Sequence, residues 1–154
     1  MRVSAFTVVS SVGFFMFKRL RFIFIAFLFV FFNFALSGGK EPIFSRYALK
    51  DEFEVYLENG SLGDGIINLS AREFYGVGGI KGESCYTAAP YEEILNDFGA
   101  KTVFSEKTAY GISFYAFSPK IPYRAAINGK TVNIQYFVGE NSVKIGTPLI
   151  FGGY

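Results

Sequence analysis

The residues that most often carry enzyme chemistry are scarce in this chain of 154 residues. It has no histidine, so it lacks the usual general base near neutral pH and any Ser-His-Asp or Cys-His pairing. Its one cysteine, Cys85, has no partner for an intrachain disulfide or a two-cysteine metal site. We interpret Cys85 as a small buried strand residue, and the alternatives are a nucleophile near Lys81 or an intermolecular disulfide.

The acidic residues form no recognisable catalytic pair. Glu92 and Glu93 are adjacent on a predicted helix, where their side chains point about 100° apart, and the helix dipole explains their position in the first turn. Asp64 lies between two glycines, which is typical of a turn and less so of a cation site. The sequence therefore predicts no catalytic residue, no cofactor and no metal, and it favours a non-enzymatic protein.

Apolar residues and positive charge are concentrated near the amino end. Residues 1–37 hold 11 of the 20 phenylalanines and no acidic residue. The remaining 117 residues have 11 Lys and Arg against 13 Asp and Glu, a net charge of about −2. Because nucleic-acid binding requires a basic surface on the folded domain, we predict no nucleic-acid partner.

The amino-terminal pattern is typical of export. An apolar run over 22–36 follows three basic residues within 18–21, and small residues come next. This pattern predicts a signal peptide cleaved between Ser37 and Gly38, or an uncleaved membrane anchor. Basic residues before an apolar run keep the amino end in the cytoplasm, so the rest of the chain is predicted to be secreted or held at the outer face of the cytoplasmic membrane.

The predicted layout has three parts. Residues 1–37 are the signal peptide or anchor, residues 38–50 a linker, and residues 51–154 a single exported domain. A true start at Met16 would give a signal peptide of ordinary form, whereas a longer chain would have an extended basic region or a helical hairpin.

The first half of the domain predicts strands separated by turns. Residues 51–57 alternate between charged and apolar side chains, as in a half-buried strand, and Asn59-Gly60 is expected to end it. A further turn is expected at 63–65 and a second strand at 66–69. Residues 71–80 are predicted to be a strand or bulged hairpin, because their glycines follow too soon after a possible capping box for a long helix.

The second half predicts one helix and several strands. Residues 90–99 begin with a proline, end with a glycine, and carry apolar residues at helical spacing between them. A strand is expected before this helix at 82–87, and a strand pair after it at 101–105 and 111–117. Asn128-Gly129 predicts a hairpin turn. Residues 130–138 and 143–151 predict a final hairpin in which Val138 lies opposite Val143. The predicted fold class is therefore α+β, a curved antiparallel sheet with one helix packed on a face.

Part of this pattern resembles a known family. The segments 98–101, 117–119, 132–135 and 145–152 are similar to the carboxy-terminal part of YwmB-like proteins, over roughly residues 82–154. The resemblance implies an exported or membrane-anchored α+β domain from Gram-positive spore formers with a TATA-box-binding-protein-like shape. That shape does not itself imply DNA binding, and the resemblance implies no biochemical role.

The second half holds more aromatic residues than one small core obviously needs, and exposed aromatic side chains often mark interfaces. The candidate interaction residues are Tyr110, Phe114, Tyr115, Phe117 and Tyr123. We favour a non-enzymatic cell-envelope protein that binds another envelope protein or itself and contacts the membrane through its amino-terminal segment. The alternative is an extracellular small-ligand or glycan-binding domain, which requires a pocket with convergent polar groups. A hydrolase would require two acidic side chains in one cleft.

Overall fold

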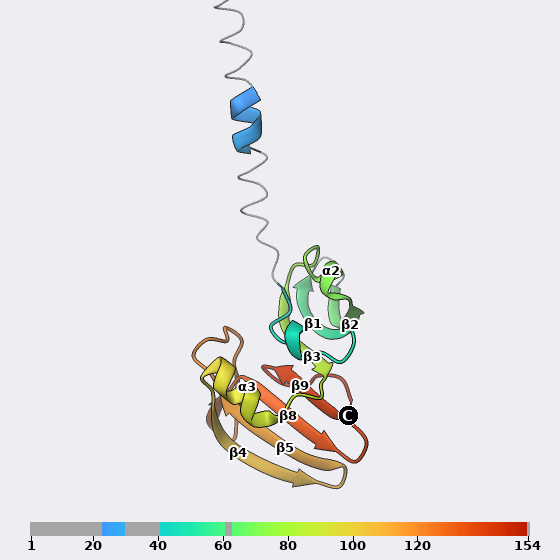
Figure 1. Cartoon of the computed structure of the whole chain (residues 1–154), viewed down its shortest axis with the longest axis vertical. Coiled ribbons are helices and arrows are strands. Elements are labelled where there is room, and N and C mark those ends of the chain that lie inside the picture. Colours follow the sequence, from blue (N-terminus) through green and yellow to red (C-terminus); the bar gives the residue numbers. More distant parts are fainter. Residues whose placement is uncertain (1–22, 30–40, 61–62, 154) are drawn as a thin grey trace, which may run out of the picture. The chain divides into compact units, whose positions relative to one another are not determined.

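The computed structural model describes residues 23–29, 41–60 and 63–153 (Figure 1). The chain consists of two compact units, residues 1–38 and 39–154. In the first, residues 23–29 form a short helix with exposed side chains. Within the described ranges no helix combines the length and apolar character needed to cross a membrane. The predicted cleavage between Ser37 and Gly38 and the possible start at Met16 lie outside the described residues.

The second unit is an α+β structure built on a seven-stranded antiparallel sheet, which confirms the predicted fold class at this level. The sheet order is β2-β1-β3-β9-β8-β5-β4, and a separate hairpin pairs β6 with β7. The strands are β1 (Phe53–Gly60), β2 (Gly63–Leu69), β3 (Ile80–Tyr86), β4 (Lys101–Thr108), β5 (Gly111–Phe117), β6 (Ala125–Ile127), β7 (Lys130–Val132), β8 (Ile134–Gly139) and β9 (Val143–Thr147). The helical segments are η1 (Ser45–Tyr47), α2 (Ala71–Phe74) and α3 (Tyr91–Phe98).

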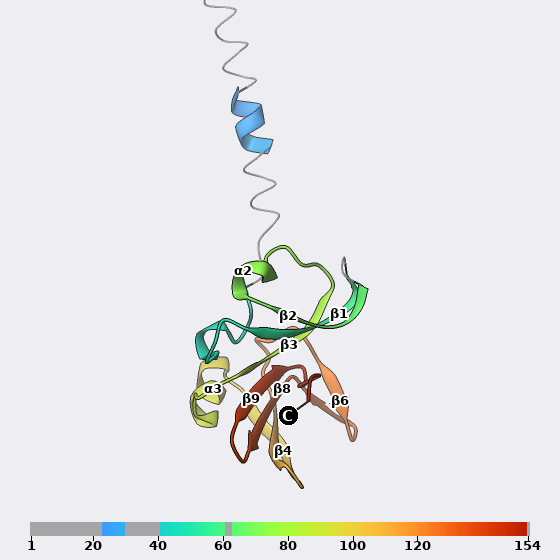
Figure 2. The ribbon, with the colours of Figure 1, turned by 90° about the vertical axis from the view of Figure 1, so that its right-hand side faces the viewer.

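One face of the sheet carries the hydrophobic core. Alternation along β1 places Phe53, Val55 and Leu57 on this face, and all three are at most 1% exposed. Ile145 of β9 and Ile94 of α3 belong to the same buried cluster. Figure 2 shows α3 on one side of the β4, β8 and β9 strands and β6 on the other. The predicted alternation of residues 51–57 is thus confirmed.

Part of the opposite face is covered by the carboxy-terminal segment. After β9 the chain passes through a cis Thr147–Pro148 bond. Phe151 then stacks on Tyr56 of β1, with ring centroids 4.5 Å apart. Gly82 of β3 leaves room for this segment, because a Cβ there would lie 2.6 Å from the Thr147 carbonyl oxygen. The last residues are therefore part of the folded sheet domain.

Helix α3 forms where its sequence predicts it. Pro90 is the N-cap residue, and Gly99 ends the helix in the left-handed conformation with φ of 57°. The Tyr91 ring lies 5.0 Å from Phe114 and 5.1 Å from Tyr136, measured between centroids. An eight-residue helix is marginal alone, so these contacts with the sheet stabilise it.

The predicted register of the final hairpin is confirmed. Val138 pairs with Val143, and two residues away Tyr136 pairs with Ile145. Asn128 and Gly129 adopt φ angles of 50° and 72°, as a tight β6–β7 turn requires. Both hairpins thus follow from local turn chemistry and from matched apolar faces.

One predicted strand is broken in two. Residues 130–138 were expected to be continuous, but β7 and β8 belong to different sheets and buried Asn133 lies between them. Its side chain accepts a hydrogen bond from the Ser118 amide at 2.7 Å and donates to the carbonyl oxygens of Ser118 and Ile121 at 2.6 and 3.1 Å. These bonds satisfy backbone groups of the preceding loop, and this explains the break.

Several boundaries in the first half differ from the sequence prediction. β1 runs to Gly60 and β2 begins at Gly63, so the segments expected as turns at 59–60 and 63–65 lie within strands. The prediction of a strand or hairpin for 71–80 is wrong at its start, because α2 forms there. Ser70 and Glu73 form both bonds of a capping box. The short helix is stabilised by this cap and by buried Phe74.

The structure also revises the predicted linker at 38–50. From residue 41 onward this segment packs on the sheet domain, and Phe44 is fully buried against Phe98 of α3 with ring centroids 5.5 Å apart. Buried Tyr47 in η1 donates a hydrogen bond to the Asp97 carboxylate. The sheet domain therefore begins before residue 51.

Candidate functional site

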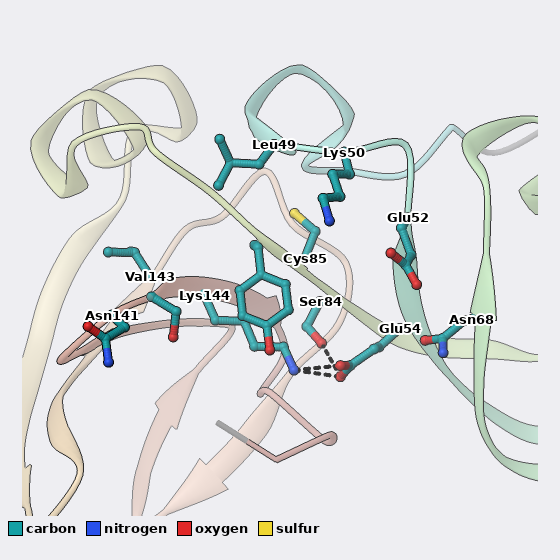
Figure 3. Close-up of a pocket in the computed structure, with 12 residues that line it drawn as sticks. Leu49, Lys50, Glu52, Glu54, Asn68, Ser84, Cys85, Asn141, Val143 and Lys144 are labelled. Atoms are coloured by element: carbon teal, nitrogen blue, oxygen red, sulfur yellow. Dashed lines mark hydrogen bonds and ion pairs between the residues drawn. The ribbon is translucent and has the colours of Figure 1, made fainter.

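A cavity of about 330 Å³ opens on the face of the sheet opposite the core, at the junction of β1, β3 and β9 (Figure 3). Its lining comes from four separate parts of the chain. The residues are Leu49, Lys50, Glu52, Glu54, Asn68, Ser84, Cys85, Tyr86, Asn141, Ser142, Val143 and Lys144. Its size falls at the lower end of the range for small-molecule sites.

Backbone hydrogen bonds hold two opposite walls of the cavity. The segment after η1 is tied to the end of β3, because the Leu49 amide donates to the Tyr86 carbonyl oxygen at 2.9 Å. The β8–β9 turn is closed by the Gly139 amide, which donates to the Ser142 carbonyl oxygen at 2.9 Å. The first wall therefore depends on a contact between segments far apart in the sequence, whereas the second is a local turn.

A buried ion pair forms the floor of the cavity. Lys144 is 1% exposed, and its Nζ lies 2.7 Å from each carboxylate oxygen of Glu54. Its third hydrogen bond goes to the Gly153 carbonyl oxygen at 2.9 Å. The three donors of the ammonium are thus all used. Figure 3 shows the Lys144 amine and the Glu54 carboxylate pointing toward each other below the cavity.

Two neighbours complete this floor. The Ser84 hydroxyl donates to Glu54 Oε2 at 3.3 Å, and the Lys144 ammonium lies 5.2 Å from the centre of the Tyr86 ring. The Tyr86 ring is 45% exposed, so one side stabilises the cation while the rest remains available to a ligand.

Cys85 lies at the edge of the cavity but is only 2% exposed. Burial, assisted by the nearby Glu83 carboxyl and opposed by Lys144, raises the pKa of the Cys85 thiol to about 12. A thiol with this pKa is not a nucleophile at neutral pH. This supports the interpretation of Cys85 as a buried strand residue.

Glu83 is a second buried charge-bearing residue, on the core face of β3. Its Oε1 accepts the Phe44 amide at 3.0 Å. Its Oε2 has no partner in the described part of the chain, and neither has Oγ1 of Thr147, the residue directly opposite on β9. Burial raises the pKa of the Glu83 carboxyl to about 7, against the lowering effect of backbone hydrogen bonds from Phe44 and Ile43.

The five predicted interaction aromatics do not form a single surface. Tyr110, in the β4–β5 turn, is 77% exposed, whereas Tyr115 is 5% exposed and stacks on Phe104 on the face opposite the core. Phe114 and Tyr123 are half-buried against the core, and half-buried Phe117 lies under the Arg124 guanidinium. The alternation of β5 separates Phe114 from Tyr115 and Phe117.

The residues of the cavity were missed by the sequence reading. Glu54 was assigned to the charged outer side of its strand, and Lys144 is the only charged residue of β9. That lone lysine, on the face opposite Val143 and Ile145, was the available signal, but its partner on β1 is 90 residues away. The described residues include no cluster of three or more side chains suited to a metal ion.

Comparison of this chain with protein-family models, with curated proteins and with solved structures gives no significant match. The site is therefore interpreted from its own geometry.

The buried ion pair yields a first prediction. Replacing Lys144 by methionine leaves the Glu54 carboxylate partly buried without its cation, and we expect a loss of about 3–5 kcal/mol in the free energy of unfolding. The matched control is Lys81→Met, because the Lys81–Glu58 pair also links β1 to another strand of the sheet, β3, but is more than half exposed. We expect Lys81→Met to lower the free energy of unfolding by less than about 1 kcal/mol. Urea unfolding of the full chain measures both, and equal losses would contradict a structural role for the buried pair.

Glu83 yields a second prediction, on pH. The folded state holds the Glu83 proton up to about pH 7, whereas the unfolded chain releases it near 4.5. Stability therefore falls as pH rises between these values, by about 3 kcal/mol in total. The Glu83→Gln variant should lose this dependence and be more stable than the wild type at pH 8. Glu58→Gln, on the exposed side of β1, is the control. Parallel stability curves for wild type and Glu83→Gln between pH 5 and 8 would show the prediction to be wrong.

Proposed function

We propose that this chain is an exported or membrane-tethered cell-envelope protein whose sheet domain binds a small polar ligand without catalysis. Export is supported by the basic and apolar pattern of residues 18–36. The resemblance to YwmB-like proteins agrees with an exported α+β domain and stays a prediction. Ligand binding is supported by the cavity between β1, β3 and β9, which meets the requirement for convergent polar groups in a pocket.

The observation that carries this proposal is the fully hydrogen-bonded Lys144 ammonium at the cavity floor. Burying an ion pair in a small domain costs desolvation energy that apolar side chains would avoid. A ligand site benefits from such a pair, because it fixes dipoles and hydrogen-bonding groups before the ligand arrives. The exposed part of the Tyr86 ring and the Asn68 and Asn141 amides then provide stacking and hydrogen bonds.

The same geometry disfavours chemistry at this site. Two carboxylates, Glu52 and Glu54, line the cavity, as a hydrolase would require. However, both Glu54 oxygens accept hydrogen bonds from Lys144, and one also accepts from Ser84. Both Glu54 oxygens are thereby engaged in structural hydrogen bonds, and the raised pKa of the Cys85 thiol leaves that thiol protonated. Binding is the function that these groups support.

The test is a search for ligands that require the cavity. Saturation-transfer NMR of the full chain against a library of small polar metabolites and saccharides should find ligands whose signal is lost in Tyr86→Ala. We expect at least a tenfold weaker affinity in this variant, because it removes the aromatic ring that forms part of the cavity floor. Tyr110→Ala, which removes an exposed tyrosine elsewhere, is the control. A library with no ligand sensitive to Tyr86→Ala would overturn the proposed function.

A second candidate function is protein binding at the far end of the sheet. Tyr110 is 77% exposed there, and the paired residues Ile112 and Val138 are 38% and 37% exposed on the face that carries the core. A shallow hollow formed by the β4–β5 and β8–β9 turns adjoins them. Neighbouring exposed apolar side chains of this kind favour an interface.

This candidate has a separate test. In the Tyr110→Ser and Val138→Thr double variant, cell-surface crosslinking should lose any partner or self-association that depends on this patch. The free energy of unfolding should change by less than about 1 kcal/mol, because Tyr110 is 77% exposed and threonine keeps the branched shape of the 37% exposed Val138 side chain. A matched double variant on the exposed side of α3, Glu92→Gln with Asn96→Ser, is the control. Crosslinked species of the same kind and yield in both variants would exclude this patch as the interface.

A further inference from the structure

The charges that line the cavity divide into a paired set and an unpaired set. Lys144 and Glu54 neutralise each other at the floor. Lys50 and Glu52, on the segment that leads into β1, are both exposed and line the same cavity. Neither has an ion pair or side-chain hydrogen bond within the described ranges, although they are two residues apart. Lys50 and Glu52 form the rim of the cavity. The rim thus presents one cation and one anion that make no ion pair with other residues of the described ranges.

Figure 3 shows how these two side chains lie. Lys50 and Glu52 extend from the same segment toward the cavity, with the Lys50 amine beside the Cys85 side chain in this view and the Glu52 carboxylate farther to the right. Asn68 of β2 lies beyond Glu54, and Asn141 lies at the opposite end. A ligand in the cavity would therefore meet the two opposite charges along one edge and neutral amide groups at its ends.

We infer that the ligand of this cavity is a small zwitterion of amino-acid or dipeptide size, with its carboxylate at Lys50 and its ammonium group at Glu52. This inference rests on the proposed ligand-binding function and names its ligand class. The two charge pairs complement each other, so a zwitterion leaves no charge of the rim unpaired. The side chain of such a ligand would lie against Leu49, Val143 and the exposed part of the Tyr86 ring.

Other ligand classes fit the rim less well. A neutral sugar would cover Lys50 and Glu52 without neutralising them, and this costs desolvation energy with no ionic compensation. A simple anion would pair with Lys50 but lie beside the Glu52 carboxylate, which repels it. A simple cation would pair with Glu52 but lie beside the Lys50 ammonium. The cavity volume of about 330 Å³ also suits a compact ligand better than an oligosaccharide.

The experiment compares four matched probes by titration calorimetry on the full chain in a detergent without a sugar headgroup. They are leucine, 4-methylvalerate, which lacks the amine, 3-methylbutylamine, which lacks the carboxylate, and glucose. We expect leucine to bind at least tenfold more tightly than each of the other three, because only leucine neutralises both rim charges. The dipeptide leucyl-leucine extends the series toward the upper size limit.

Two variants test which charge meets which group. Lys50→Met should abolish the advantage of leucine over 3-methylbutylamine, and Glu52→Gln should abolish its advantage over 4-methylvalerate. Lys81→Met and Glu58→Gln, which change the exposed pair on β1 and β3, are the controls and should leave all four affinities unchanged.

The outcomes separate this inference from the function on which it rests. Binding of glucose or of a single-charge probe as tightly as leucine overturns the zwitterion but leaves the cavity as a ligand site. Leucine binding that is unaffected by Lys50→Met and Glu52→Gln also overturns it. If neither leucine nor leucyl-leucine binds, while the library search finds Tyr86-dependent ligands of another class, the inference fails alone. If that search finds none, both fail.

Discussion

The structure of the sheet domain depends on one strand, β9, and on the buried ammonium that it carries. β9 lies between β3 and β8, so it is the link between the three amino-terminal strands and the strands β4, β5 and β8. Lys144, the second residue of β9, extends to Glu54 on β1, two strands away, and to the carbonyl oxygen of Gly153. A single side chain thus ties together both parts of the sheet and the carboxy-terminal segment. Removing one partner of such a buried pair costs more than the pair contributes, because the other charge remains in a poorly solvated place.

This arrangement also explains why the carboxy-terminal residues fold back over the sheet. On the face opposite the core, the side chains near β3 and β9 are polar or charged. These side chains therefore offer few apolar contacts to hold the carboxy-terminal residues. The segment after β9 instead supplies the Gly153 carbonyl to Lys144, the Ile150 amide to Gln135, and the Phe151 ring to Tyr56. Backbone groups that would otherwise need water are satisfied by the sheet, and the Phe151 ring gains a stacking contact at the same time.

The parts of the fold that depend on neighbouring residues were predictable, and those that depend on distant residues were not. The turn at Asn128-Gly129, the ends of α3 and the pairing of Val138 with Val143 follow from local turn chemistry, capping and alternation. The break at Asn133 was missed, because its hydrogen bonds go to the loop at 118–121. The α2 helix was missed because glycines at 76–79 outweighed a correct capping box, and a helix of four residues needs no more than that box and one buried side chain.

The cavity is one of the features that depend on residues far apart in the sequence, so no local sequence pattern could indicate it. Its floor requires β1, β3 and β9 to be paired, and its walls come from the segment after η1 and from the β8–β9 turn. None of these parts forms the cavity alone, so the cavity exists only when both halves of the sheet are joined. A ligand bound across this junction would stabilise the β3–β9 pairing by mass action. Under the proposed function, occupancy of the cavity would therefore be coupled to the integrity of the whole sheet, a property that a site within one hairpin would lack.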